Sequence, residues 1–461
     1  MKAAGAVFLV VLAFFSGLNA QTQQDSMPAM HNMGRSQQQS PNDNPLPQMG
    51  TPATDNRPVY HLAELEAMAL QQNPTLLQAD ALQRMAEGRK QQAGLWPNPT
   101  LGYFGDEISG GFGVNGGRQG GFIEQTILLG RKLYLAQRVA SDDQRIAGLQ
   151  KEEQRYRVQN AVRAAYFQTL AAQEMLSLMT ARAELASRTL DNTRLLQNTG
   201  ARDASEVAMA EIELERARLN VEVQHTQLEE QWEILRSILA TPSLPEGHLA
   251  GKLDADLPQI EPQQLVNALL AESPAVKIAR QRMERAQNSL VQEQRRAVPD
   301  LQLRAGLEQN FETNDLTGRP YGVQGVAEAR IGLPLFNRNQ GGVTAARAEL
   351  ESSQAESRAI ELQLRHEAAA VVQQYESARL TVEGYRDKIL PRTRALYEMQ
   401  RNAWGRMALS YPQLLLAEQN LFTSQAEYIH ALQNLRTSAV ALSGFLLTEQ
   451  LATTSLDCCR K

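Results

Sequence analysis

The sequence predicts a mainly α-helical protein with a small β part, in which a helix–strand–strand–helix–helix unit occurs twice. The composition is typical of long helices, because 43% of the residues are hydrophobic while only 5% are aromatic. A repeat at a spacing of about 200 residues indicates the duplication. Heptad spacing of apolar residues in the last helix of each unit predicts that these helices pack as coiled coils.

The start of the chain has the features of a secretory signal peptide, assigned to residues 1–20. Lys2 precedes a short apolar run, residues 5–15, and Ala20 offers a cleavage site. Residues 21–57 are rich in Gln, Ser, Pro and Asn, which predicts a disordered tether. The formal net charge of −5 is too small to indicate a nucleic-acid partner.

The two predicted repeats occupy residues 58–245 and 246–449, and a flexible tail follows at 450–461. Each repeat opens with a helical stretch that contains an X–Pro pair. These stretches are residues 62–95 with Asn73-Pro74, and residues 265–297 with Ser273-Pro274. A long helix and a last helix complete each repeat, at residues 132–197 and 205–239 and at residues 343–402 and 411–447. The first long helix would run roughly 100 Å, which no compact domain accommodates twice. Gly384 and Pro391 are expected to bend or interrupt its counterpart.

In the short segments between the helices, apolar and polar residues alternate. This pattern is typical of membrane strands, which face lipid on one side and water on the other. The clearest alternation runs through Leu301, Leu303, Ala305 and Leu307 on one face and Gln302, Arg304, Gly306 and Glu308 on the other. A half-buried strand of a soluble sheet would show the same pattern. Four strands cannot close a barrel, and an open sheet edge cannot lie in lipid. We therefore expect a trimer with a 12-stranded membrane β-barrel.

This layout resembles the TolC family of bacterial outer-membrane efflux factors over residues 60–447. Residues 331–339 (IGLPLFNRN) resemble the family's strand-to-helix crossing in the second half, and residues 124–132 resemble the crossing in the first half. The resemblance implies a homotrimer with a β-barrel in outer-membrane lipid and an α-barrel of coiled-coil helices across the periplasm. It also implies two partners, a periplasmic adaptor (membrane fusion) protein and an inner-membrane efflux pump. The implied function is a passive export duct.

The resemblance also places the adaptor-contacting tips at the turns between the long and last helices. These tip residues are Thr199, Gly200, Ala201, Gly405, Arg406 and Met407. Glu206 and Gln413 fall at the family's acidic pore aperture, so a trimer would carry one charged ring instead of two. Helix capping is the alternative role, because Asp203 with Glu206 and Ser410 with Gln413 have the spacing of a capping box.

Four candidate soft-metal ligands cluster in the tether: Met27, Met30, His31 and Met33. Thioether and imidazole groups suit Cu(I) or Ag(I), although a chance cluster in a polar segment would look the same. Together with the resemblance, the cluster favours the heavy-metal branch of the family. Drug efflux and type I protein secretion remain alternatives. Cys458 and Cys459 supply only two ligands, which do not complete a metal site.

The sequence predicts neither an enzyme nor a bound cofactor. Gly111, Gly113 and Gly116 match a dinucleotide-binding pattern, but no helix follows them, so we interpret them as part of an extracellular loop. A periplasmic coiled-coil scaffold is the alternative from another functional class, since it would keep the heptads without barrel strands. The expected location is the outer membrane, with a long periplasmic portion.

Overall fold

A computed structural model describes residues 57–108, 117–257, 259–313, 316 and 318–448. These residues fall within one structural unit. The signal peptide, the methionine cluster of the tether, the glycine motif at 111–116 and the two C-terminal cysteines lie outside the described residues.

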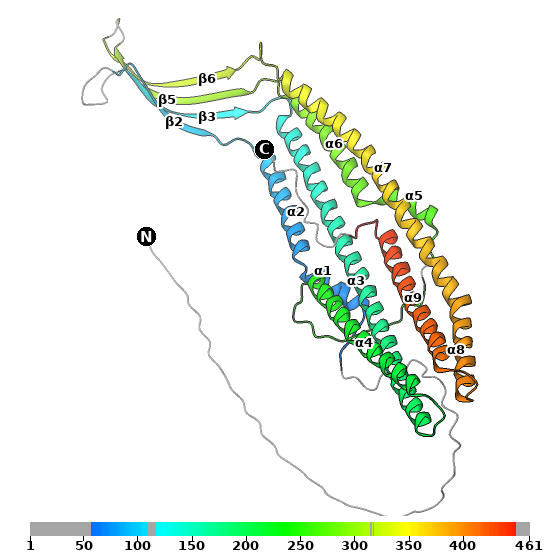
Figure 1. The fold of residues 1–461 in the computed structure, drawn as a ribbon. Helices are drawn as coiled ribbons and strands as arrows, with labels where there is room; N and C mark the ends of the chain where they lie inside the picture. Colours follow the sequence, from blue (N-terminus) through cyan, green and yellow to red (C-terminus); the bar gives the residue numbers. More distant parts are fainter. Residues whose placement is uncertain (1–56, 109–116, 258, 314–315, 317, 449–461) are drawn as a thin grey trace, which may run out of the picture. The chain divides into compact units, whose positions relative to one another are not determined.

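The described elements follow the predicted order twice (Figure 1). The first repeat contains β1 (Val59–Tyr60), α1 (Leu62–Gln72), α2 (Pro74–Ala93), β2 (Thr100–Asp106), β3 (Arg118–Ile127), α3 (Lys132–Asn198) and α4 (Ala204–Leu239). The second contains β4 (His248–Leu249), α5 (Pro262–Glu272), α6 (Pro274–Arg295), β5 (Leu301–Thr313), β6 (Pro320–Ile331), α7 (Gln340–Gly384), η1 (Tyr385–Ile389), α8 (Leu390–Gly405) and α9 (Tyr411–Ser443).

Each opening stretch is two helices instead of the single one predicted. The break falls at the residue before proline, where Asn73 has ψ of 120° and Ser273 has ψ of 134°. A proline sterically excludes the α conformation from the residue that precedes it, but fits well at the first position of a new helix. Asn73 also caps α2, because its side-chain oxygen accepts the Thr75 N–H at 2.9 Å.

The two long helices differ in regularity. Helix α3 runs without interruption for 67 residues, which corresponds to roughly 100 Å. Its counterpart contains the expected interruption, in the form of the π-helical turn η1 before Pro391. In this turn the Leu390 N–H bonds to the carbonyl of Tyr385, five residues back, so the helix widens and continues where proline removes a donor. Within the described part of the chain, no helix is both long and apolar enough to cross a membrane.

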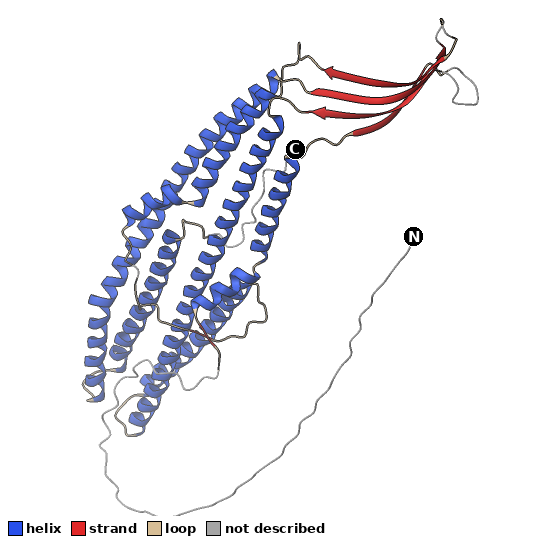
Figure 2. Cartoon of the chain, turned by 180° about the vertical axis from the view of Figure 1, so that it is seen from behind, coloured by secondary structure: helices blue, strands red, loops and turns tan. Residues whose placement is uncertain are grey.

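The four long strands form one antiparallel sheet, drawn in red in Figure 2, and their order in the sheet is β2-β3-β5-β6. Strands β2 and β3 belong to the first repeat and β5 and β6 to the second, so the β3–β5 pairing joins the two halves. The strands connect directly to α2, α3, α6 and α7, which places the sheet at the ends of these helices. Its outer strands β2 and β6 have no further strand partner among the described residues.

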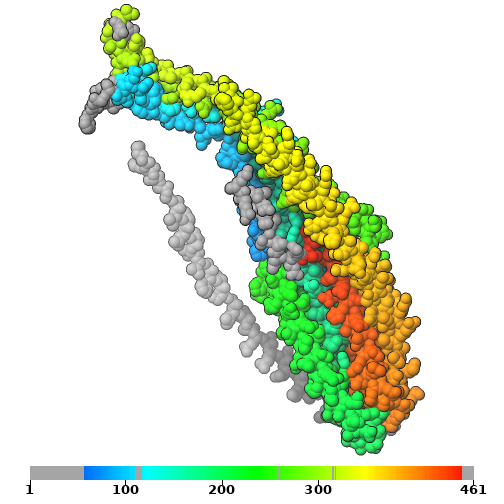
Figure 3. Space-filling model, turned by 45° about the horizontal axis from the view of Figure 1, so that its top comes forward, coloured from blue at the N-terminus to red at the C-terminus, as the bar shows by residue number. Residues whose placement is uncertain are grey.

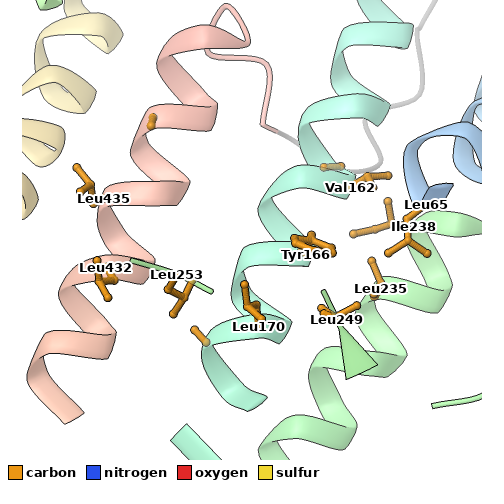
Figure 4. Close-up of a cluster of buried hydrophobic side chains, with 14 of the residues drawn as sticks. Leu65, Val162, Tyr166, Leu170, Leu235, Ile238, Leu249, Leu253, Leu432 and Leu435 are labelled. Carbon is orange, nitrogen blue, oxygen red and sulfur yellow. The ribbon is translucent and has the colours of Figure 1, made fainter. Parts of the chain in front are cut away.

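The main apolar core lies where α1, α3, α4, α9 and the β1–β4 pair meet (Figure 4). Trp232 is 1% exposed, and its ring lies 5.9 Å from that of Tyr60 in an edge-to-face arrangement. Leu65 and Leu235 are fully buried beside them, and each contributes about 2 kcal/mol to folding by leaving water. This cluster fixes the helices relative to one another at a point distant in sequence from the four-stranded sheet.

The heptad positions of the last helices are mostly buried, as predicted. Five of them are buried: Leu214, Leu235, Leu421, Leu435 and Leu442. The remaining three, Val221, Leu228 and Tyr428, are half-buried. Helices α3 and α9 also pack against each other, so the two repeats share one interior.

Candidate functional site

One face of the four-stranded sheet is apolar and exposed. Its exposed members include Leu101, Tyr103, Ile123, Leu303, Leu307, Tyr321, Val323 and Ile331. Leu101 lies opposite Ile123 in the register, and Ala305 and Ala327 continue that row across the sheet. A contiguous apolar patch of this kind marks a surface that meets lipid or another protein.

The opposite face of the sheet is polar and charged. Glu124, Arg304 and Glu328 lie in one cross-strand row. The guanidinium of Arg304 lies 3.6 Å from the Phe122 ring centroid, and its Nη1 is 3.8 Å from Oε2 of Glu328. The alternation predicted for residues 301–308 therefore produces two chemically distinct faces.

The predicted tips lie at two helical turns, between α3 and α4 and between α8 and α9 (Figure 1). The green and orange surfaces near these turns lie at the same end of the helices in Figure 3. All six predicted tip residues are exposed. Gly200 has a φ of +74°, and Met407, the equivalent residue of the second repeat, has a φ of +58°. The second turn thus adopts the left-handed conformation without a glycine. This conformation is unfavourable for a residue with a side chain, such as methionine.

Arg202 joins the two turns. Its Nη1 donates to the carbonyl of Leu409 at 3.0 Å, and its Nη2 donates to the carbonyl of Trp404 at 3.2 Å. The guanidinium also lies 5.6 Å from the Trp404 ring centroid, within cation–π range. This contact was not predicted, because nothing in the local sequence pattern pairs Arg202 with residues of the second repeat.

Glu206 belongs to the same contact. Its Oε1 lies 3.5 Å from Nη1 of Arg202 and accepts the Tyr411 N–H at 3.2 Å, and the side chain is 15% exposed. The predicted capping box of the first repeat is wrong, since Asp203 makes no side-chain capping bond at α4. Glu206 instead caps the first turn of α9, where a carboxylate is favourable.

The capping prediction for the second repeat is confirmed. The Ser410 N–H donates to Oε1 of Gln413 at 3.4 Å, and the Ser410 hydroxyl donates to the same oxygen at 3.2 Å. Gln413 is exposed and Glu206 is not, so the two predicted aperture positions occupy different environments in this chain.

A second buried polar cluster lies among α3, α4, α8 and α9, and it was not predicted from the sequence. It contains an ion pair between Arg182 and Glu213, with Glu418 beside it. Burial, together with the negative charge of Glu213, raises the pKa of Glu418 to about 7, against an opposing effect of Arg182. The only signal in the sequence was the position of Glu418 opposite Glu211 when the two last helices are aligned.

The described residues contain no group of three or more His, Cys, Asp and Glu side chains that could hold a metal ion. The predicted ligands Met27, Met30, His31 and Met33 lie outside the described residues. The two candidate functional features in the described part are the two-faced sheet and the joined helical tips.

Comparisons with known proteins agree with this architecture. The family model described as outer membrane efflux protein matches residues 65–241 and 265–446, one match in each repeat. The cobalt-zinc-cadmium resistance protein CzcC of Cupriavidus metallidurans is 25% identical over 282 residues, which cover 61% of this chain. The matched segment spans 66% of that relative, slightly less than two thirds of its length.

Solved structures share the fold. CusC matches with a TM-score of 0.70 and 16% identity over 86% of this chain and 93% of that chain. VceC of Vibrio cholerae matches with a TM-score of 0.67 and 19% identity over 85% and 97% of the two chains. The resemblance inferred from the repeat layout and the two crossing motifs is thereby confirmed, and the chain belongs to the outer membrane efflux protein family.

Proposed function

We propose that this chain forms, as a homotrimer, an outer-membrane duct through which heavy-metal cations such as copper or silver leave the periplasm. The observation that carries the proposal is the two-faced sheet attached to long helices. Its apolar face suits lipid, its charged face suits an aqueous bore, and the helices below it suit a tunnel. Such a duct is passive and has no reaction to catalyse.

The sheet edges support the trimer. Backbone groups on the outer sides of β2 and β6 need hydrogen-bond partners if they enter lipid. Pairing β2 of one protomer with β6 of the next supplies these partners. Three protomers with four strands each then close a barrel wide enough for water, which a single protomer cannot do.

The exposed tips are proposed as the contact with a periplasmic adaptor protein, which would connect the duct to an inner-membrane pump. These turns carry Gly200 and Met407 at matching places in the repeats. Glu206 is proposed to line the aperture once its bonds to Arg202 and Tyr411 are released. Its free carboxylate would then attract cations, as acidic rings do in other pores.

The proposed cargo rests on the similarity to the cobalt-zinc-cadmium resistance protein and on the methionine cluster of the tether. Tolerance assays test it in a strain that lacks the gene. We expect tolerance to copper, silver or a related heavy metal to fall and to return with the wild-type gene. Unchanged metal tolerance combined with sensitivity to organic toxins would replace the metal cargo with drugs.

Assembly is tested separately from cargo. Native mass spectrometry of the detergent-extracted protein should give the mass of three mature chains. A stable monomer under these conditions would overturn the trimer and would favour the coiled-coil scaffold instead.

A further inference from the structure

Two glutamates are buried in the described helices. Glu213 on α4 and Glu418 on α9 are each 2% exposed. A buried carboxylate is strongly disfavoured in its charged form unless a positive charge or several hydrogen bonds compensate it. The compensation available to each glutamate therefore decides its protonation.

The available positive charge is taken by Glu213. Arg182 of α3 pairs with Oε1 of Glu213, and Gln419 Nε2 donates to Oε2 of the same carboxylate at 3.4 Å. The guanidinium of Arg182 also lies 5.9 Å from the Phe422 ring centroid. Glu213 thus has partners for both of its oxygens.

Glu418 has no equivalent compensation. Its Oε1 is fully buried and has no hydrogen-bond partner within the described residues. The groups that act on it are Glu213 of α4, which repels its charge, and Arg182 of α3, which is already paired. When Glu418 carries a proton, its charge is zero and the charges of Glu213 and Arg182 cancel, so the cluster of these three residues has no net charge.

Helices α3 and α4 form one helical hairpin and α8 and α9 form a second, and two phenols of the second hairpin face the same cluster. Burial and then the charge of Glu418 raise the pKa of Tyr397 on α8 to about 12, so this phenol stays protonated. Burial, followed by the charges of Glu418 and Glu213, also raises the pKa of Tyr411 on α9. Around Tyr397 lie three further charges: Arg401 and Glu398 of α8 and Arg188 of α3. A change of charge on Glu418 therefore affects Tyr397 and Tyr411 of α8 and α9 as well as Glu213 of α4.

The matching residue of the first repeat has a different environment. Glu211 pairs with Arg194 at 2.7 Å, and both side chains are about half exposed. The duplication therefore supplies an internal control, a glutamate at the same place in the last helix that is solvated and paired. Only the copy in the second repeat is enclosed between the hairpins.

We propose that Glu418 is a proton-binding site, at which one proton neutralises the buried Glu213–Arg182–Glu418 cluster and holds the α8–α9 hairpin against α3 and α4. Loss of the proton places a second, unpaired negative charge between the hairpins and favours their separation. The site would make the packing of the helical tips sensitive to pH. This proposal deepens the proposed duct function, because the tips are its proposed aperture.

The direction of the pH effect follows from the shift. Burial, together with the Glu213 charge, raises the pKa of Glu418 from 4.5 to about 7 in the packed state. Packing is therefore most favourable below pH 4.5, and this stabilisation is lost as the pH rises through about 7. Between pH 6 and pH 8 the packing equilibrium should weaken about tenfold.

Hydrogen exchange on the full-length trimer tests the site without relying on transport. Amide protection in α8 and α9, corrected for the intrinsic pH dependence of exchange, should fall about tenfold from pH 6 to pH 8. In Glu418→Gln, which mimics the protonated form, protection should keep its high value at both pH values. Glu211→Gln is the matched control and should retain the wild-type pH dependence.

Two results would overturn the proton site. One is a wild-type pH dependence that persists in Glu418→Gln, and the other is a wild-type protein without pH dependence. If Glu418→Gln does not fold, Glu213→Gln decides instead, because removing the neighbouring charge should move the midpoint to lower pH. An unchanged midpoint in that variant would also overturn the site. Failure of metal export would remove the proposed cargo but would leave these exchange results in place.

Discussion

Replacing Leu307 by arginine tests whether the apolar face of the sheet meets lipid. Leu307 is the central residue of β5, which has 13 residues. At roughly 3.3 Å per residue and a tilt of about 45°, this strand spans about 30 Å along the membrane normal, the thickness of the hydrocarbon core. Leu307 therefore falls near the middle of the bilayer. Its cross-strand neighbours are Gly121 and Gly325, so the longer side chain meets no bulky residue.

The expected cost follows from this depth. An arginine on the lipid face at the bilayer midplane destabilises a membrane barrel by about 2–4 kcal/mol, and the cost falls towards the interfaces. A trimer that unfolds as one unit carries the substitution three times, so its total loss is roughly threefold larger. Gln324→Arg is the control, because Gln324 lies on the polar face of the neighbouring strand, directly opposite Glu308. There the new charge faces the proposed bore and should cost little.

Refolding into lipid vesicles measures the difference. Urea titrations followed by tryptophan fluorescence should show a clearly lower midpoint for Leu307→Arg than for wild type, with Gln324→Arg close to wild type. The amount of trimer recovered from membranes should fall in the same order. Equal midpoints for the two variants would refute the assignment of the faces.

Three further changes probe the tips and the tether. Glu206→Gln should lower the free energy of unfolding by about 1–3 kcal/mol, because Arg202, whose side chain is 9% exposed, loses its counter-charge. An unchanged melting temperature would contradict this. Planar-bilayer recordings of the same variant test whether cation selectivity falls. Met407→Gly should raise the melting temperature through a gain of up to about 1 kcal/mol, because glycine adopts the positive φ without strain; a loss of stability would show that the methionine side chain contributes more than its backbone costs. Replacing Met27, Met30 and Met33 together with isoleucine should lower copper or silver tolerance at unchanged protein level; unchanged tolerance would leave the tether as a spacer.

The helices and strands were predictable because their signals are local and repeated. The duplication identified helical stretches whose outer bounds differ from the observed ones by only a few residues, and the alternating residues located the strands without giving their full length. The prediction of a single helix through Asn73-Pro74 was wrong, although the conformational restriction before proline is also a local rule. It predicts two helices, and the periodic pattern on both sides obscured the break.

The contacts at the tips were not predictable in the same way. Arg202 and Glu206 bond to Leu409 and Tyr411, which lie about 200 residues further along the chain. A capping-box spacing identifies a carboxylate near a helix start, but it cannot say which helix start the carboxylate reaches. The burial of Glu418 likewise depends on how the two hairpins pack, since the matching Glu211 is exposed.

The turns at Gly200 and Met407 share a left-handed backbone conformation but differ in their side chains. In a trimer the two turns of each protomer would give six places with the same backbone path. Only three of them would carry methionine, and the other three would carry no side chain at that point. A ligand that recognises main-chain atoms alone would find sixfold equivalence there. A ligand that binds the methionine thioether would bind with a stoichiometry of three per channel. The measured number of ligands per channel therefore distinguishes recognition of the main chain from recognition of the side chain.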